Sequence, residues 1–364
     1  MKKNLLYFLF FLSQTALAQI DNRSLENVFP LDSTVSKRLT FQFSTLYFVK
    51  NNEYFNEIAD GYTLWGYQMN PRIAYQPAAN VSLTGGVFLQ HDFGQDGLSQ
   101  VLPTFTIKIQ HKNWDYLFGT LDGSINHRLI EPLYNFERLL KSRVENGLQI
   151  KKITDKSFFD FWISYPKTTG PGQSSQEIFW GGISSERLIH TKNNFSLRWP
   201  LQFTGFHLGG QNLAIALPIR SAFHLNTGLT FDWKLSQKFL KNIEFTPYIM
   251  GFNEIADQNK SGWAFYPNLI LHTSAFKMQL SYWQGKNYVA DFGGDLYQSI
   301  SRKYSNLNYE EPKRNVLIMR FIKEIQVIQN LNISIRFEPH YDFINHKFEH
   351  SEGVYVNYHL AHRF

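Results

Sequence analysis

The last eleven residues of the chain, VYVNYHLAHRF (residues 354–364), alternate apolar and polar side chains. One face carries Val354, Val356, Tyr358, Leu360 and Phe364, with His362 as the exception, and the other carries Tyr355, Asn357, His359, Ala361 and Arg363. A period of two with one apolar face is typical of a β-strand between unlike environments. Because terminal residues usually fray, a patterned strand that continues to the final residue indicates that this end of the chain is held in a sheet.

The opposite end of the sequence, MKKNLLYFLFFLSQTALAQ, has two lysines, a short apolar stretch and a small-residue exit at Ala16-Leu17-Ala18. These features predict a secretory signal peptide over residues 1–18, and the apolar stretch is too short to span a bilayer as a helix. The sequence contains no cysteine, which excludes a lipid-modified cysteine, disulfide bonds and thiolate chemistry.

The composition is unusual because aromatic residues are abundant while the chain as a whole is hydrophilic. Aromatic side chains make up 16% of the residues, yet the mean hydropathy is −0.31. A soluble all-β protein or a membrane β-barrel could have this composition, since barrel strands are only half apolar and carry aromatic girdles at the membrane interfaces. The formal net charge of +6 is mild and dispersed, which gives no support for binding of nucleic acid.

The alternation of the last strand recurs along the chain, for example in LTFQFSTLYFV (residues 39–49), FTIKIQ (residues 105–110) and AFHLNTGLTFDWKL (residues 222–235). The connections between such segments are alternately long and short, which is the anatomy of outer-membrane barrels. The count of segments predicts about sixteen strands, within a range of fourteen to eighteen. We therefore expect an all-β, transmembrane, antiparallel up-and-down barrel over residues 39–364, preceded by a periplasmic segment over residues 19–38.

A closing strand that ends on an aromatic residue resembles the C-terminal signature of porin-like Gram-negative outer-membrane β-barrels. The resemblance implies that Phe364 is the signal that the barrel assembly machinery recognises, and that the protein resides in the outer membrane, in contact with lipid and lipopolysaccharide. The glutamine after the signal peptide and the Phe-, Tyr- and Asn-rich strands are similar to barrels of the Bacteroidota.

Strand alternation assigns a set of charged side chains to the barrel interior, where they would line a pore. The basic members are Arg72, Lys108, Arg143, Lys151, Arg198, Lys234, Lys277, Arg320, Arg336 and Arg363, and the acidic members are Glu145, Asp160, Asp232, Glu244 and Glu338. An excess of ten basic over five acidic residues would favour anionic solutes. The alternative is that these charges pair across the lumen and plug it.

Three long connections have features of their own. In residues 121–141, Leu129, Leu133, Phe136 and Leu140 recur at helical spacing, which predicts an amphipathic helix that either folds into the barrel or lies across its rim. The Gly-rich stretch FHLGGQ (residues 206–211) and the apolar residues after it suggest a second loop folded inward. Residues 285–312 are long and Tyr-rich enough to contact a protein partner.

Catalysis has little support in the sequence. Ser124, Asn126 and His127 invite comparison with outer-membrane phospholipases, which use a Ser-His-Asn arrangement, but the pattern around the catalytic pair of that family is missing. The histidines form no metal-binding motif, and no nucleotide-binding motif is present. We therefore expect a protein that is not an enzyme and has no cofactor or metal.

Two functions remain open. The first is a porin-like channel for small hydrophilic solutes with a preference for anions, since barrels of this size can enclose an aqueous lumen. The second is a plugged barrel that serves as a binding or assembly partner of an outer-membrane or secretion complex, through its extracellular loops.

Overall fold

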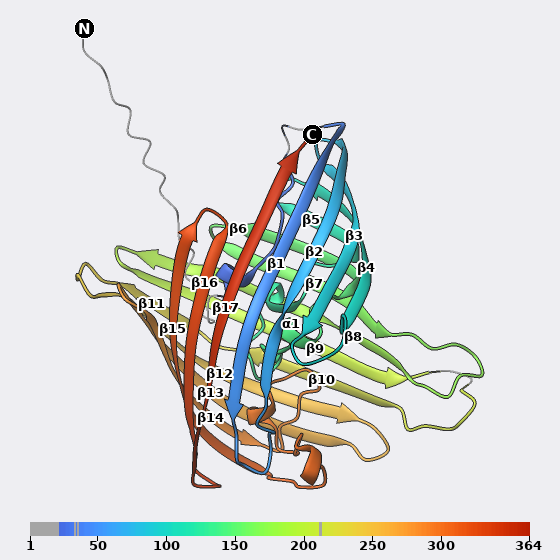
Figure 1. Ribbon diagram of the computed structural model, residues 1–364. Coiled ribbons are helices and arrows are strands. Elements are labelled where there is room, and N and C mark those ends of the chain that lie inside the picture. Colours follow the sequence, from blue (N-terminus) through green and yellow to red (C-terminus); the bar gives the residue numbers. More distant parts are fainter. Residues whose placement is uncertain (1–21, 33, 35, 211–212) are drawn as a thin grey trace.

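The computed structural model describes residues 22–364, except residues 33, 35 and 211–212. In the described residues, seventeen strands form one continuous antiparallel sheet (Figure 1). The strands are β1 (Arg38–Glu53), β2 (Thr63–Ala78), β3 (Val81–Asp92), β4 (Gln100–His111), β5 (Trp114–Thr120), β6 (Asn146–Thr154), β7 (Ser157–Lys167), β8 (Glu177–Lys192), β9 (Phe195–Gly209), β10 (Arg220–Thr227), β11 (Thr230–Lys234), β12 (Leu240–Ile255), β13 (Lys260–Thr273), β14 (Lys277–Lys286), β15 (Lys313–Ile328), β16 (Leu331–Asp342) and β17 (Lys347–Arg363). The short helices are η1 (Arg23–Leu25), η2 (Ser124–His127), α1 (Arg138–Lys141), η3 (Asp295–Tyr297) and η4 (Tyr304–Asn306). None of the helices in the described part of the chain is long and apolar enough to cross a membrane.

The sheet closes on itself because the first strand pairs with the last. β1 is hydrogen-bonded to β17 from the pair Thr40–Arg363 to the pair Glu53–His350, and to β2 on its other side. β10 and β11 both lie between β9 and β12, so they are two halves of one interrupted strand, and seventeen segments make a barrel of sixteen strands. The predicted all-β barrel of sixteen strands is confirmed.

Connection lengths alternate as the sequence predicted. Two-residue turns join β4 to β5, β8 to β9 and β15 to β16, and each has a residue with positive φ, at Lys112, Asn193 and Asn330 respectively. Two-residue hairpins favour such backbone angles. The long loops, including residues 121–145 and 287–312, all lie at the opposite end of the barrel from these turns (Figure 1). By the anatomy of outer-membrane barrels, the long-loop end is extracellular and the short-turn end is periplasmic.

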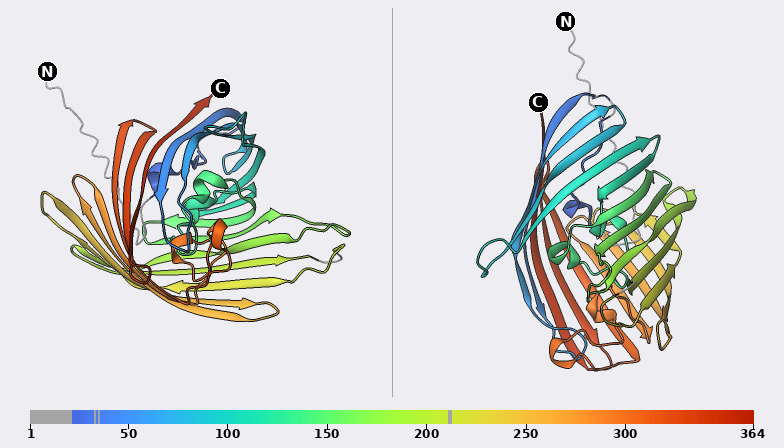
Figure 2. Two further views of the ribbon diagram at one scale, coloured as in Figure 1. Left: turned by 60° about the horizontal axis from the view of Figure 1, so that its bottom comes forward. Right: turned by 90° about the vertical axis from the view of Figure 1, so that its right-hand side faces the viewer.

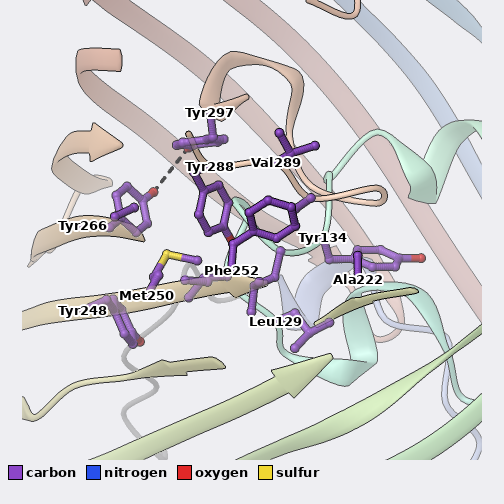
Figure 3. Packing of buried hydrophobic residues seen from close by; sticks show 14 of the residues in the cluster. Leu129, Tyr134, Ala222, Tyr248, Met250, Phe252, Tyr266, Tyr288, Val289 and Tyr297 are labelled. Atoms are coloured by element: carbon purple, nitrogen blue, oxygen red, sulfur yellow. Dashed lines mark hydrogen bonds between the residues drawn. The ribbon is translucent and has the colours of Figure 1, made fainter. Parts of the chain in front are cut away.

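Two long loops fold into the barrel and fill it (Figure 2). Residues of the β5–β6 loop, among them Leu129 and Tyr134, pack against Tyr288 and Tyr297 of the β14–β15 loop and against the inward faces of the strands (Figure 3). The hydroxyls of Tyr266 on β13 and Tyr297 lie 3.3 Å apart. The interior of this barrel is therefore a hydrophobic core at the level of these loops.

The four apolar residues that predicted a helix in the β5–β6 loop, Leu129, Leu133, Phe136 and Leu140, are all buried in the barrel. The version of the prediction in which this loop folds inward is correct, although the α-helix is only the single turn α1. The loop after β9 differs from the prediction, because Ile215 and Ile219 are half exposed at the long-loop end rather than folded inward.

The described part of the N-terminal segment also lies against the inner wall. Leu25 is completely buried with Leu46 on β1, Leu139 on α1 and Tyr355 on β17. The backbone carbonyl of Ser24 accepts a hydrogen bond from Asn357 on β17. The signal peptide predicted at residues 1–18 lies outside the described residues, and the periplasmic location of residues 19–38 stays a prediction.

The outward faces of the strands carry exposed apolar side chains, whereas the inward faces are polar or packed. On β4, Phe105 is 52% exposed and Lys108 is buried. We predict that Phe105→Arg lowers the free energy of unfolding by about 2–4 kcal/mol, because it places a charge in the lipid layer. Chemical unfolding of the barrel in lipid vesicles measures this change.

Lys108→Gln is the matched control on the same strand, since it adds no charge to the lipid face, and it should insert as the wild type does. Normal insertion of the Phe105 variant together with failed insertion of the Lys108 variant would contradict the assigned facing of β4.

Candidate functional site

Most of the predicted pore-lining residues face the barrel interior. Inward strand positions are held by Arg72, Lys108, Lys151, Asp160, Arg198, Asp232, Glu244, Lys277, Arg320, Arg336 and Glu338, while Arg143 and Glu145 reach the interior from the β5–β6 loop. Lys234 and Arg363 are exposed near the short-turn end. Phe364 is 70% exposed, and its backbone N–H donates to the carbonyl of Leu39 on β1. Its role as an assembly signal stays a prediction.

Many interior cations are paired with carboxylates, several of which come from the loops, whereas Arg143 donates to Gln68 and to the Leu25 carbonyl. Arg320 is bonded to Glu131 of the β5–β6 loop and, at 2.8 Å, to Glu338 on β16. Lys50 on β1 lies 2.6 Å from Glu137 of the same loop. The strand pattern suggested a basic excess, but it did not include these loop carboxylates, which offset the charge of the wall. The positive excess of the interior is therefore smaller than the strand pattern predicted, and the preference for anions stays a prediction.

Two cavities between the interior loops and the barrel wall are small. One of about 50 Å³ lies between the β5–β6 loop and the wall near Arg320 and Glu338. Another of about 70 Å³ lies near Arg72 and Arg143. Each has room for only a few water molecules. The alternative in which the loops plug the lumen agrees with this packing better than an open channel does.

Ser124 and His127 do not form a catalytic pair. His127 is completely buried, with its Nδ1 2.7 Å from Asp160 and its Nε2 3.2 Å from Glu145, and its ring stacks on Trp162. The hydroxyl of Ser124 has no hydrogen-bond partner among the described residues. Burial opposes protonation of His127, but the charges of Glu145 and Asp160 outweigh it and raise its pKa to about 9. A cationic imidazole with both nitrogens occupied cannot accept a proton from a nucleophile, so its role is to hold η2 against the wall.

A second serine–histidine pair lies on the outer surface of the barrel. His207 is near the end of β9 and Ser221 near the start of β10, and the two residues are directly opposite each other in the sheet. Ser221 Oγ lies 2.8 Å from His207 Nδ1. Both residues alternate with inward-facing neighbours, Phe206 and Ala222, so their side chains face outward, toward lipid. Both are partly exposed and lie at the long-loop end of the barrel.

The other ring nitrogen of His207 lies over Gly209, two residues further along β9. A Cβ atom at position 209 would come within 2.5 Å of His207 Nε2, so only glycine leaves space for the ring in this orientation. Gly209 is paired with Glu177, the first residue of β8, and the carboxylate of Glu177 accepts a hydrogen bond from the Tyr165 hydroxyl on β7. An acidic side chain therefore lies on the neighbouring strand, beside the position over which Nε2 projects.

The surface around this pair suits an apolar substrate. Ile255 on β12 is opposite Ser221 and is 55% exposed, and Ile219 just before β10 is exposed to the same extent. Toward the membrane centre, Gly181 and Gly205 are directly paired on the outward face, where they leave the sheet without side chains. A carbonyl group bound at Ser221 would thus have apolar surface on several sides.

The sequence profile of the lipid A 3'-O-deacylase-type family matches residues 31–364. The chain belongs to the lipid A 3'-O-deacylase-type family. Because this family is named for an enzyme, the prediction that the chain is not an enzyme is wrong. A comparison with curated proteins found no match.

Solved structures with the same fold as this family member are outer-membrane proteins. OprD from Pseudomonas aeruginosa has a TM-score of 0.51 at 11% identity, and the alignment covers 92% of this chain and 98% of OprD. OpdK from the same organism has a TM-score of 0.52 at 9% identity, with 90% of this chain and all of OpdK covered. A loop-deletion mutant of OmpT from Vibrio cholerae has a TM-score of 0.52 at 8% identity, with 88% and 99% covered. At these identities the likeness concerns the fold alone.

One prediction is thereby decided. The porin-like outer-membrane barrel architecture is confirmed. Membership of the Bacteroidota type and passage of solutes through the lumen stay predictions.

The sequence drew attention to Ser124 and His127 rather than to Ser221 and His207. His207 and Gly209 belong to the FHLGGQ stretch, whose glycines stood out, but the serine that pairs with His207 follows a loop of ten residues, 210–219. One signal was present in the alternation itself. A histidine at an outward position, between the apolar strand and the loop, is out of place on a face that should contact lipid.

We predict that stability depends on pH through His127. Its pKa is raised to about 9 in the folded state, above the unfolded value of about 6.5. The cation therefore stabilises the fold fully below about pH 6.5, and this contribution, of about 3 kcal/mol, is lost as the pH rises through 9. Unfolding at a series of pH values measures the change, and His127→Gln should remove this part of the slope. An equal slope in both proteins would contradict the charged, paired state of His127.

We also predict that the filled lumen conducts little. Purified barrel in a planar bilayer should show low steady conductance, and replacement of residues 125–141 by a short Gly-Ser connection should raise it. Shortening of the β3–β4 loop, residues 93–99, is the matched control, because this loop is mostly exposed. High steady conductance of the wild-type protein would contradict a plug made by the interior loops.

Proposed function

We propose that this barrel is an esterase of the outer leaflet, which hydrolyses an acyl ester of lipid A with Ser221 as nucleophile and His207 as base. The observation that carries the proposal is the 2.8 Å contact between Ser221 Oγ and His207 Nδ1 on the lipid-facing surface. A serine is a weak nucleophile unless a base within hydrogen-bond distance takes its proton. Membership of a family named for lipid A deacylation supports the choice of substrate.

The position of Ser221 and His207 on the barrel agrees with a lipid substrate in the outer leaflet. Lipid A anchors lipopolysaccharide in the outer leaflet, so its esters lie near the outer membrane interface rather than in the lumen. Ser221 and His207 are at the long-loop ends of β10 and β9 and face outward. A lipid ester can reach them by diffusion within the leaflet, whereas the interior serine Ser124 is enclosed by the loop packing.

The chemistry requires only the residues present and one water molecule. With the proton of neutral His207 on Nε2, the Ser221 hydroxyl donates to Nδ1. Its oxygen attacks the ester carbonyl carbon as the proton passes to His207, and the bond to the sugar oxygen breaks as His207 returns the proton to that oxygen. Water, deprotonated by His207, then cleaves the acyl-serine ester, which releases the fatty acid and restores the serine.

A third group usually orients the base in such pairs. Glu177 is the candidate, because it is paired with Gly209, over which Nε2 of His207 projects. A carboxylate there would accept the Nε2–H bond and stabilise the imidazolium that forms during attack. Its effect would be smaller than that of Ser221 or His207, since Tyr165 already donates to it.

We predict that Ser221→Ala and His207→Gln each reduce fatty-acid release from lipid A in mixed micelles by about a thousandfold or more, because either change removes the nucleophile–base pair. Mass spectrometry of the lipid product measures the release. Ser124→Ala is the matched control and should keep full activity, since its hydroxyl is inside the barrel.

Two outcomes would contradict the proposal at different levels. Full activity of Ser221→Ala would show that another residue is the nucleophile. Absence of fatty-acid release by folded wild-type protein, with lipid A of varied acylation, would show that the barrel is not this esterase.

A further inference from the structure

Two lysines lie side by side on the outer surface, and no residue in the described part of the chain provides a counter-ion for them. Lys286 is the last residue of β14 and Lys313 the first of β15, and they are directly opposite each other in the sheet. Both are exposed, and their neighbours Gly285 and Arg314 face inward, so the lysines face outward. Within the described residues neither ammonium group forms a hydrogen bond or an ion pair. Cations inside the barrel can have a carboxylate partner: Arg314, for example, lies 2.6 Å from Asp342.

Like charges directly opposite each other in a sheet destabilise it, so this pair needs an explanation. The nearest carboxylates in the sequence do not compensate for it. Glu311 is turned inward, 2.9 Å from Arg314. Glu310 is exposed in the loop, where its backbone bridges to Ile300, and no ion pair joins it to Lys313 in the structure. The two positive charges are therefore left for a ligand.

The surroundings of the lysines add further donors and an interfacial position. One step toward the membrane centre, Gln284 and Asn315 form the next outward-facing pair, and each carries an amide NH₂. Trp263 on β13 is opposite Lys286 and is 48% exposed. Exposed aromatic residues at this level mark the boundary between lipid and water. Two ammonium groups and two amides at that boundary match the acceptor oxygens and negative charge of a phosphate group.

We infer that Lys286, Lys313, Gln284 and Asn315 bind the phosphate-bearing head group of the lipid substrate and hold the lipid on the outward face that also carries Ser221. This inference rests on the proposed function for the identity of the lipid. Strands β10, β12, β13, β14 and β15 are successive neighbours. At about 4.8 Å per strand, Lys286 is roughly 14 Å from strand β10 around the barrel. The registers place it level with Leu225, which is four residues from Ser221 along β10. The outward face between them carries exposed Ile255, Trp263 and Leu225, on which acyl chains can lie.

The first test compares kinetics on phosphorylated and dephosphorylated lipid A. The double variant Lys286→Gln/Lys313→Gln should raise KM for the phosphorylated lipid roughly 30-fold with kcat unchanged, because each lysine contributes to binding of an anionic lipid surface. Wild type and variant should act alike on the dephosphorylated lipid. Lys192→Gln/Lys323→Gln removes two exposed lysines near the short-turn end and is the matched control. Unchanged KM in the first variant would overturn the inference.

The second test measures binding without catalysis, so that the two proposals fail separately. Ser221→Ala protein should retain phosphorylated lipid A in native mass spectrometry, and the added lysine substitutions should release it. Lysine-dependent retention by a barrel that hydrolyses no lipid would uphold the anchor and overturn the esterase. Equal displacement by inorganic phosphate at the same concentration would overturn the assignment to a lipid head group, because a free anion would then suffice.

Discussion

In the hydrocarbon layer a backbone N–H or C=O group has no water to bind, so every strand of a membrane-spanning sheet must have a partner on both sides. The pairing of β1 with β17 over fourteen residue pairs meets this requirement, and much of the rest follows from it. Closure forces side chains to alternate between lipid and interior, places all long connections at one end, and explains why the chain remains ordered in a strand as far as Arg363.

Closure also encloses polar and charged side chains, and the loops provide partners for several of them. An interior of polar and charged side chains would be costly to dehydrate unless each charge has a partner. Here the β5–β6 loop brings Glu131 to Arg320 and Glu137 to Lys50, while its apolar residues pack with those of the β14–β15 loop. The barrel therefore has a core like that of a soluble protein. Because the lumen is filled in this way, we expect a functional site on the outer surface of the barrel rather than in the lumen.

On that outer surface, polar side chains lower the stability of the barrel because they face lipid or its interface. Their presence there therefore calls for a functional explanation. The pair of Ser221 and His207 and the pair of Lys286 and Lys313 both break the apolar pattern at the long-loop end. In the proposed function, the first supplies a nucleophile and a base, and the second supplies unpaired positive charge. Together they would allow the barrel to hold and cleave an anionic lipid ester in its own leaflet, as proposed above. The porin-like fold by itself does not decide between this activity and transport, because the same barrel can support either.

The sequence by itself determined the barrel, its strand number, the alternation of loop lengths and the facing of residues such as Phe105 and Lys108. These are local properties, since a period of two and a run of turn residues are visible within a single segment. The pairing of interior charges and the contact between Ser221 and His207 were decided only by the tertiary structure. Glu131 meets Arg320 across 189 positions of sequence, and His207 meets Ser221 because the register of β9 and β10 places them opposite each other. Register and loop position depend on how the whole sheet closes, and no single segment of the sequence carries that information.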